Sequence, residues 1–112
     1  MRKRTSTPSV DAADRHADLV AALAGAVFDS EAVTDRPRRA AAATPGAELP
    51  PELASYVTRV RDASYRITDA DIAALRTAGH GEEEIFELTI AAALGAAMMR
   101  RDAGLAALRG EA

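Results

Sequence analysis

The run 85–99, near the C-terminal end of the chain, is apolar on almost every side. Glu87 and Thr89 are its only clearly polar residues. A helix of this kind has to be covered by other elements on most of its faces. A helix that spans a bilayer needs roughly 20 apolar residues, and this run is shorter. The sequence therefore predicts a helix that is buried in protein.

The stretch before this run predicts a short helix that ends at a glycine. Thr68 and Asp71 have the spacing of a capping box, in which a hydroxyl and a carboxylate each accept from a backbone amide at the start of a helix. Gly79 is expected to end this helix in a left-handed conformation, which glycine adopts without strain. Glu82, Glu83 and Glu84 then suit the positive end of the dipole of the next helix.

Two helical segments are expected in the N-terminal half. The first begins at Asp11, carries an apolar face as far as Phe28 and frays near Ser30. The second spans one or two turns over 36–43, with Pro37 tolerated in its first turn. Residues 1–9 are low in apolar content, so we expect them to be disordered, before a single helical domain over 10–112.

A third segment predicts a longer helix that begins at Pro51, a residue that suits a first turn. One apolar face recurs at helical spacing, and Arg61 is expected on the opposite, outer side. The residues of the apolar face are Leu53, Tyr56, Val57, Val60, Ser64 and Ile67. No segment shows the alternation of a half-buried strand. The sequence thus predicts an all-α fold, a small helical bundle.

Composition indicates that one chain makes a thin core. Hydrophobic residues are 48% of the sequence, but many are alanine, and only two Phe, two Tyr and no Trp supply bulk. Burial of so little large apolar surface barely offsets the ordering entropy of a chain of 112 residues. We therefore expect the protein to be an oligomer.

The distribution of charge and the lack of cysteine exclude several classes of function. The net charge is −3, and the acidic excess lies after Pro45, where Glu82–Glu84 would repel the phosphates of DNA from a recognition helix. Without cysteine there is no thiol nucleophile and no thiolate metal site. The basic start lacks the apolar core of a signal peptide, so we expect a cytoplasmic protein that binds neither membrane nor nucleic acid.

Five short segments carry a family resemblance. They are 49–53, 65–72, 74–76, 78–79 and 84–88, which read LPPEL, YRITDADI, ALR, AG and EIFEL. This order resembles the carboxymuconolactone decarboxylase and alkylhydroperoxidase D-like superfamily, over about residues 49–108. The resemblance implies an all-helical bundle of the alkylhydroperoxidase D-like type that forms dimers, trimers or hexamers.

The same resemblance indicates where a reactive site would lie. In the family a glutamate leads to a Cys-x-x-Cys pair and a histidine. With the Ala78-Gly79 break aligned, the cysteines fall on Ser64 and Ile67, the histidine on Asp71 and the glutamate near Glu52. Since every thiol is missing, the resemblance implies the fold and speaks against thiol peroxidase chemistry.

The remaining candidates for chemistry are few. Ser64 would need a neighbouring base, so we expect it to be a buried serine bonded to a backbone carbonyl. Glu52 and Asp71 could form an acid–base pair if burial separated their pKa values, although a first turn and a capping box already account for them. We expect His80 to be a loop residue and no metal or cofactor to bind.

Two hypotheses for the function stay open. One is a non-catalytic helical module that self-associates or joins a related partner through 85–99, whose interface would be Phe86, Ile90, Leu94 and Met98. Its small residues, among them Gly95, would let a helix of another chain approach closely. The other is a thiol-independent enzyme that uses Glu52 and Asp71 or residues of a partner chain. A cavity lined by Glu52, Ser64 and Asp71 would favour the enzyme.

The alternative to an oligomer is that the helix over 11–28 folds back and covers 85–99 within one chain.

Overall fold

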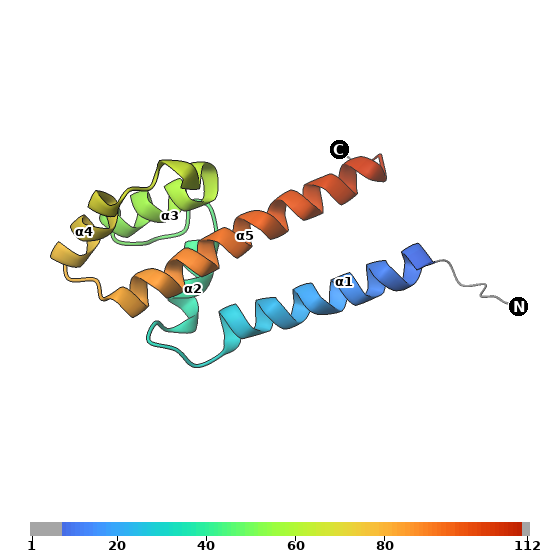
Figure 1. Cartoon of the computed structure of the whole chain (residues 1–112), viewed down its shortest axis with the longest axis horizontal. Coiled ribbons are helices and arrows are strands. Elements are labelled where there is room, and N and C mark those ends of the chain that lie inside the picture. Colours follow the sequence, from blue (N-terminus) through green and yellow to red (C-terminus); the bar gives the residue numbers. More distant parts are fainter. Residues whose placement is uncertain (1–7, 111–112) are drawn as a thin grey trace, which may run out of the picture.

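The structure, a computed structural model, describes residues 8–110 and consists of helices joined by loops (Figure 1). In chain order these are α1 (Pro8–Ala24), a π-helical turn η1 (Gly25–Asp29), α2 (Arg36–Ala43), α3 (Pro51–Ala63), a 3-10 turn η2 (Ser64–Arg66), α4 (Asp69–Thr77) and α5 (Glu82–Leu108). The prediction of an all-α fold is confirmed, because none of the described residues lies in a strand. The prediction that residues 1–9 are disordered concerns a segment that lies mostly outside the described residues.

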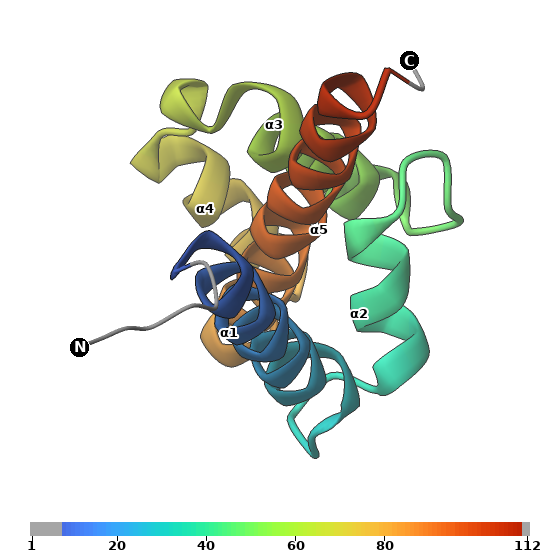
Figure 2. The ribbon, with the colours of Figure 1, turned by 90° about the vertical axis from the view of Figure 1, so that its right-hand side faces the viewer.

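Helix α5 is the element on which α2, α3, α4 and η1 pack. Helices α2 and α3 lie against its first half, and α4 joins them beside α3 (Figures 1 and 2). One face of α5 is buried by this packing, and it consists of Ile85, Leu88, Ala91, Ala92, Gly95 and Ala96. The opposite face is exposed at Phe86, Ile90, Ala93 and Ala97. Within the described chain, the helix that is apolar all round is therefore covered on one side only.

Helices α5 and α2 approach each other closely at Gly95. A β-carbon added there would lie 2.7 Å from both the β-carbon and the carbonyl oxygen of Ala43, at the end of α2. The small residues of α5 were expected to admit a helix of another chain. Here α2 of the same chain makes that approach, which brings α5 onto the C-terminal end of α2.

The helix ends predicted from the sequence are confirmed. In the capping box, the amide of Thr68 donates to Asp71 Oδ2 at 2.9 Å, and the amide of Asp71 donates to Thr68 Oγ1 at 3.4 Å. Gly79 has a φ of +103°. The amides of Gly79 and His80 then donate to the carbonyls of Arg76 and Leu75 at 3.0 Å, which is the hydrogen-bond pattern of a Schellman motif. Glu82–Glu84 form the first turn of α5.

Other details differ from the prediction. Helix α1 begins at Pro8 rather than Asp11, and proline is well suited to a first turn. Helix α3 ends at Ala63, whose φ of −156° breaks the helix, so Ser64 leaves the apolar face and is exposed rather than buried. Arg61 is buried rather than on the outer face, because it follows Val57 by one turn and its guanidinium reaches the carbonyl of Ala42 at 2.7 Å.

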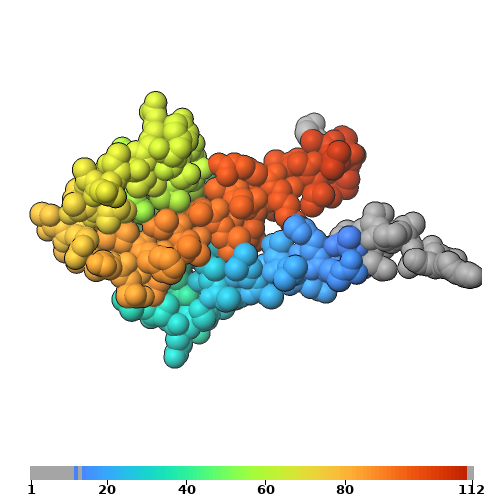
Figure 3. Space-filling view, viewed as in Figure 1, coloured from blue at the N-terminus to red at the C-terminus, as the bar shows by residue number. Residues whose placement is uncertain are grey.

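Helix α1 stands away from the rest of the described chain. Its contacts are almost confined to η1, which follows it directly. Val27 and Phe28 of η1 pack on the core, whereas Leu19 of α1 is 70% exposed. In the space-filling view, α1 and the end of α5 project from the body in the same direction (Figure 3). Only η1, and not the whole of 11–28, therefore covers part of α5 in this chain.

None of the helices formed by residues 8–110 has the length and the apolar character that a membrane span requires.

The contact at Gly95 predicts that alanine changes the stability in opposite directions at two glycines of α5. Gly95→Ala should lower the free energy of unfolding by about 1–3 kcal/mol, because the new methyl overlaps the backbone of Ala43 and forces α2 away. Gly104→Ala is the matched control in the same helix, since nothing lies within 4 Å of its added β-carbon. It should raise the stability by about 0.5–1 kcal/mol. Urea denaturation at one protein concentration measures both, and equal effects would contradict the close approach.

Candidate functional site

Two of the three candidate catalytic residues line one hollow of about 230 Å3 between α3 and α4. Glu52 comes from the first turn of α3, and Asp71 from the first turn of α4. Ser55, Tyr56, Arg59, Ala74 and Leu75 complete the lining. Ser64 does not contribute, because the break at Ala63 carries it into η2. The structure thus brings Glu52 and Asp71 to the same hollow but leaves the serine outside it.

Each carboxylate of this hollow is held by other groups. Asp71 Oδ1 lies 3.0 Å from Arg59 Nη1, while the backbone amide of Thr68, followed by Arg59, lowers the pKa of Asp71. Glu52 Oε2 lies 2.8 Å from His80 Nε2, and this hydrogen bond lowers the pKa of Glu52. The pKa values of both groups are shifted in the same direction, so the environment does not separate them into an acid and a base.

His80 is more than a loop residue. It follows Gly79 in the turn between α4 and α5, and its side chain is only 13% exposed. Its Nδ1 lies 3.0 Å from Glu84 Oε1, one turn into α5, while its Nε2 faces Glu52. The hydrogen bond to the Glu52 carboxylate raises the pKa of His80. Among the described residues, no group of three or more His, Cys, Asp or Glu side chains is arranged to hold a metal ion.

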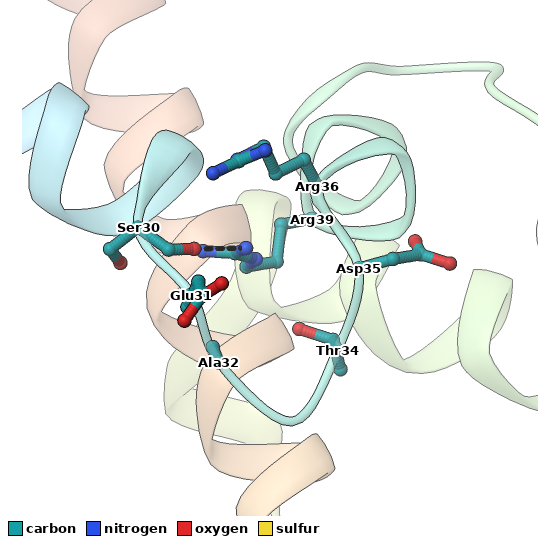
Figure 4. Close-up of a pocket in the computed structure, with 7 residues that line it drawn as sticks. All are labelled: Ser30, Glu31, Ala32, Thr34, Asp35, Arg36 and Arg39. Atoms are coloured by element: carbon teal, nitrogen blue, oxygen red, sulfur yellow. Dashed lines mark hydrogen bonds between the residues drawn. The ribbon is translucent and has the colours of Figure 1, made fainter.

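A second polar cluster joins α2 to the end of η1. Arg39 is 2% exposed, and it donates to the carbonyls of Val27 at 2.8 Å and of Ser30 at 2.6 Å. Arg36 Nε donates to the carbonyl of Asp29 at 2.6 Å. Figure 4 shows the Arg39 guanidinium pointing at Ser30 from α2, beside a hollow of about 330 Å3. Because these carbonyls end the helical segment, both cations lie at the negative end of its dipole.

Glu87 holds the loop between η1 and α2. It accepts from the amide of Val33 at 3.0 Å, and from the amide and hydroxyl of Thr34 at 2.8 and 2.6 Å. Burial raises the pKa of Glu87, but the hydrogen bonds from Thr34 and Val33 and the charge of Arg39 lower it by more, so that it ends below its ordinary value. This polar residue of the apolar run is therefore a structural acceptor.

The predicted interface residues lie on two parts of the α5 surface. Phe86 is 63% exposed and Ile90 is 38% exposed, and both border a hollow of about 170 Å3 against Ala26 and Val27 of η1. Leu94 and Met98 are half-buried. Of the four predicted interface residues, Phe86 and Ile90 thus reach the surface, at the place where α5 meets η1.

Comparisons with protein-family models, with curated proteins and with solved structures find no match to this chain. The resemblance to the alkylhydroperoxidase D-like superfamily stays a prediction.

Sequence reasoning missed the roles of His80, Arg39 and Glu87 because their partners are distant along the chain. Glu52 is separated from His80 by the rest of α3 and by α4, and Thr34 is separated from Glu87 by α2, α3 and α4. Only the spacing of four between His80 and Glu84 was a local signal, since such residues are neighbours on a helical surface.

The buried hydrogen bonds of Arg39 predict that replacing this one side chain lowers the stability of the protein strongly. Arg39→Met should lower the free energy of unfolding by about 2–4 kcal/mol, because the carbonyls of Val27 and Ser30 lose a charged donor. Arg38→Met, one residue earlier, is the control. Arg38 is more exposed and lies 3.9 Å from Glu84, so its loss should cost less than about 1 kcal/mol. Chemical denaturation of both variants tests this, and a similar cost at the two positions would show that Arg39 does not hold η1.

Proposed function

We propose that this protein is a non-catalytic helical module that self-associates through α1 and the exposed face of α5. The observation that carries this proposal is the one-sided cover of α5. Phe86, Ile90, Ala93 and Ala97 recur at spacings of three and four, so they lie on one face of the helix, and all four are exposed. We call these residues the uncovered face.

Helix α1 supports the same proposal from the other end of the chain. Helices in proteins draw most of their stability from packing of an apolar face, yet α1 packs on little besides η1. Leu19 and Leu23 are both more than half exposed. A helix in this position gains stability when apolar surface from outside the chain covers these leucines.

A second copy of the chain is the partner that would cover both α1 and the uncovered face of α5. Each copy offers an α1 without cover and an α5 with an uncovered face, and twofold symmetry lets each supply what the other lacks. The hollow of about 170 Å3 beside Phe86 and Ile90 gives this surface a concave part, into which an apolar side chain of the partner would insert. A related chain with its own uncovered helices would use the same surface.

The non-catalytic part of the proposal rests on the groups at the candidate site. Glu52 is bonded to His80, Asp71 is paired with Arg59, and Ser64 is outside the hollow. Each carboxylate therefore has a structural partner that a reaction would have to displace.

The hollow shared by Glu52 and Asp71 favours a second candidate, a thiol-independent enzyme on an alkylhydroperoxidase D-like scaffold. Turnover of a lactone or hydroperoxide substrate of that family, lost in Glu52→Gln and in Asp71→Asn, would replace the proposal of a module with this one.

The test of self-association uses two exposed aromatic residues. Phe86→Glu should shift the protein to a smaller species and weaken association at least tenfold, because an unpaired charge enters an apolar contact. Tyr65→Glu is the control, since Tyr65 lies on η2 and is 83% exposed. It should leave the solution mass unchanged. Sedimentation measures both, and a wild-type protein that is monomeric at micromolar concentration would refute the proposal.

A further inference from the structure

We propose that His80, Glu52 and Glu84 form a proton-operated latch, in which the doubly protonated ring of His80 ties the start of α3 to the first turn of α5. The latch is independent of self-association, because none of its three residues belongs to the uncovered face of α5.

With both carboxyl groups ionised, the geometry requires a proton on both ring nitrogens. His80 Nε2 lies 2.8 Å from Glu52 Oε2, and His80 Nδ1 lies 3.0 Å from Glu84 Oε1. A carboxylate only accepts hydrogen bonds, and a neutral imidazole has a single N–H to donate. In the neutral ring, one nitrogen lone pair would face a carboxylate oxygen. Only the imidazolium satisfies both contacts, and such charge-assisted bonds are the stronger ones.

The backbone presents His80 to these carboxylates. The amide of His80 donates to the carbonyl of Leu75 at 3.0 Å, and Gly79 at φ +103° turns the chain at the end of α4. Gly81 follows as the residue before α5. The glycines on both sides of His80 have no side chain that could connect α3 to α5. His80 supplies that connection.

Charged groups face the latch from each helix packed around it. Glu52 belongs to α3 and Glu84 to α5, and Arg38 of α2 lies 3.9 Å from Glu84 on its other side. Among the other charged groups of α3, α4 and α5, Arg59 pairs with Asp71 and Arg76 with Glu82, and Glu83 stands beside Glu84 in the first turn of α5. The surroundings of His80 are thus dominated by its two carboxylates, which favour the protonated ring.

The direction of the pH effect follows from these contacts. The hydrogen bond to Glu52 raises the pKa of His80, burial opposes it, and Glu84 raises it further. A histidine whose pKa is raised on folding stabilises fully below its unfolded value of about 6.5 and loses this contribution as the pH rises through the folded value. The pKa of Glu52 is lowered mainly by His80, so its contribution is lost as the pH falls through that lowered value. The latch is closed between these two limits.

The first measurement is the titration of the His80 ring by NMR in the wild-type protein. The signal is assigned with His80→Gln, which leaves His16 as the other histidine of the chain. The midpoint is expected above that of the same ring in the urea-unfolded chain, and Glu52→Gln should move it down. A midpoint at or below the unfolded value would overturn the latch, and this comparison of folded with unfolded chain is made on the wild-type protein itself.

The second measurement is the unfolding equilibrium constant as a function of pH. In the wild-type protein it should rise as the pH increases above about 6.5, by about tenfold for each unit by which the folded pKa of His80 exceeds the unfolded one. His80→Gln should lose this rise, whereas the control His16→Gln, in α1, should keep it. The same pH dependence in His80→Gln and in the wild type would also overturn the latch.

Discussion

Arginine side chains that donate to the carbonyls at helix ends hold the helices of this protein together. Arg39 of α2 binds the end of η1, Arg61 of α3 binds Ala42 in the last turn of α2, and Arg100 of α5 binds the carbonyl of Arg61 in the last turn of α3 at 2.6 Å. The last carbonyls of a helix receive no hydrogen bond from an amide of the same helix, and they form the negative end of its dipole. A guanidinium satisfies them with several donors. Each helix thereby fixes the end of another, and the series runs from α5 through α3 and α2 to η1.

This series explains which parts of the fold could be predicted from the sequence. The capping box at Thr68, the left-handed Gly79 and the proline at the start of α3 act within a few residues, so local chemistry determines them. Arg61 was wrongly expected on the outer face because a charged residue beside an apolar stripe usually faces water. Its partner, the carbonyl of Ala42, belongs to another helix and leaves no mark in the local pattern. The same reason applies to His80, since Glu52 is distant in sequence, and to Ser64, whose position depends on the backbone break at Ala63.

The small residues of α5 have a different role on each of its faces. On the buried face, Gly95 lets the backbone of α2 approach to a distance that no β-carbon could tolerate, and Ala91, Ala92 and Ala96 are covered by the same chain. On the uncovered face, Ala93 and Ala97 continue the exposed surface that begins with Phe86 and Ile90. Periodicity cannot distinguish these faces, because α5 is apolar all round. Gly95 admits the end of α2, and Arg100, one turn after Ala96, donates to the end of α3, so both contacts belong to the covered face, and Phe86 and Ile90 are left at the surface.

The acidic start of α5 has a structural use that its charge alone does not reveal. Glu82–Glu84 suit the helix dipole. Two of them also contact other parts of the chain, because Glu82 pairs with Arg76 of α4, and Glu84 faces both His80 of the preceding turn and Arg38 of α2. One turn later along α5, Glu87 accepts a hydrogen bond from Thr34 in the loop before α2. A row of carboxylates along one end of α5 thus receives donors from the turns and helices around it. Most of these donors keep their protons at any physiological pH, because they are guanidinium groups, amides and hydroxyls. The imidazole of His80 is the donor to these carboxylates that can lose its proton near neutrality, which makes its tie between Glu52 of α3 and Glu84 of α5 the pH-sensitive contact among donors that otherwise keep their protons.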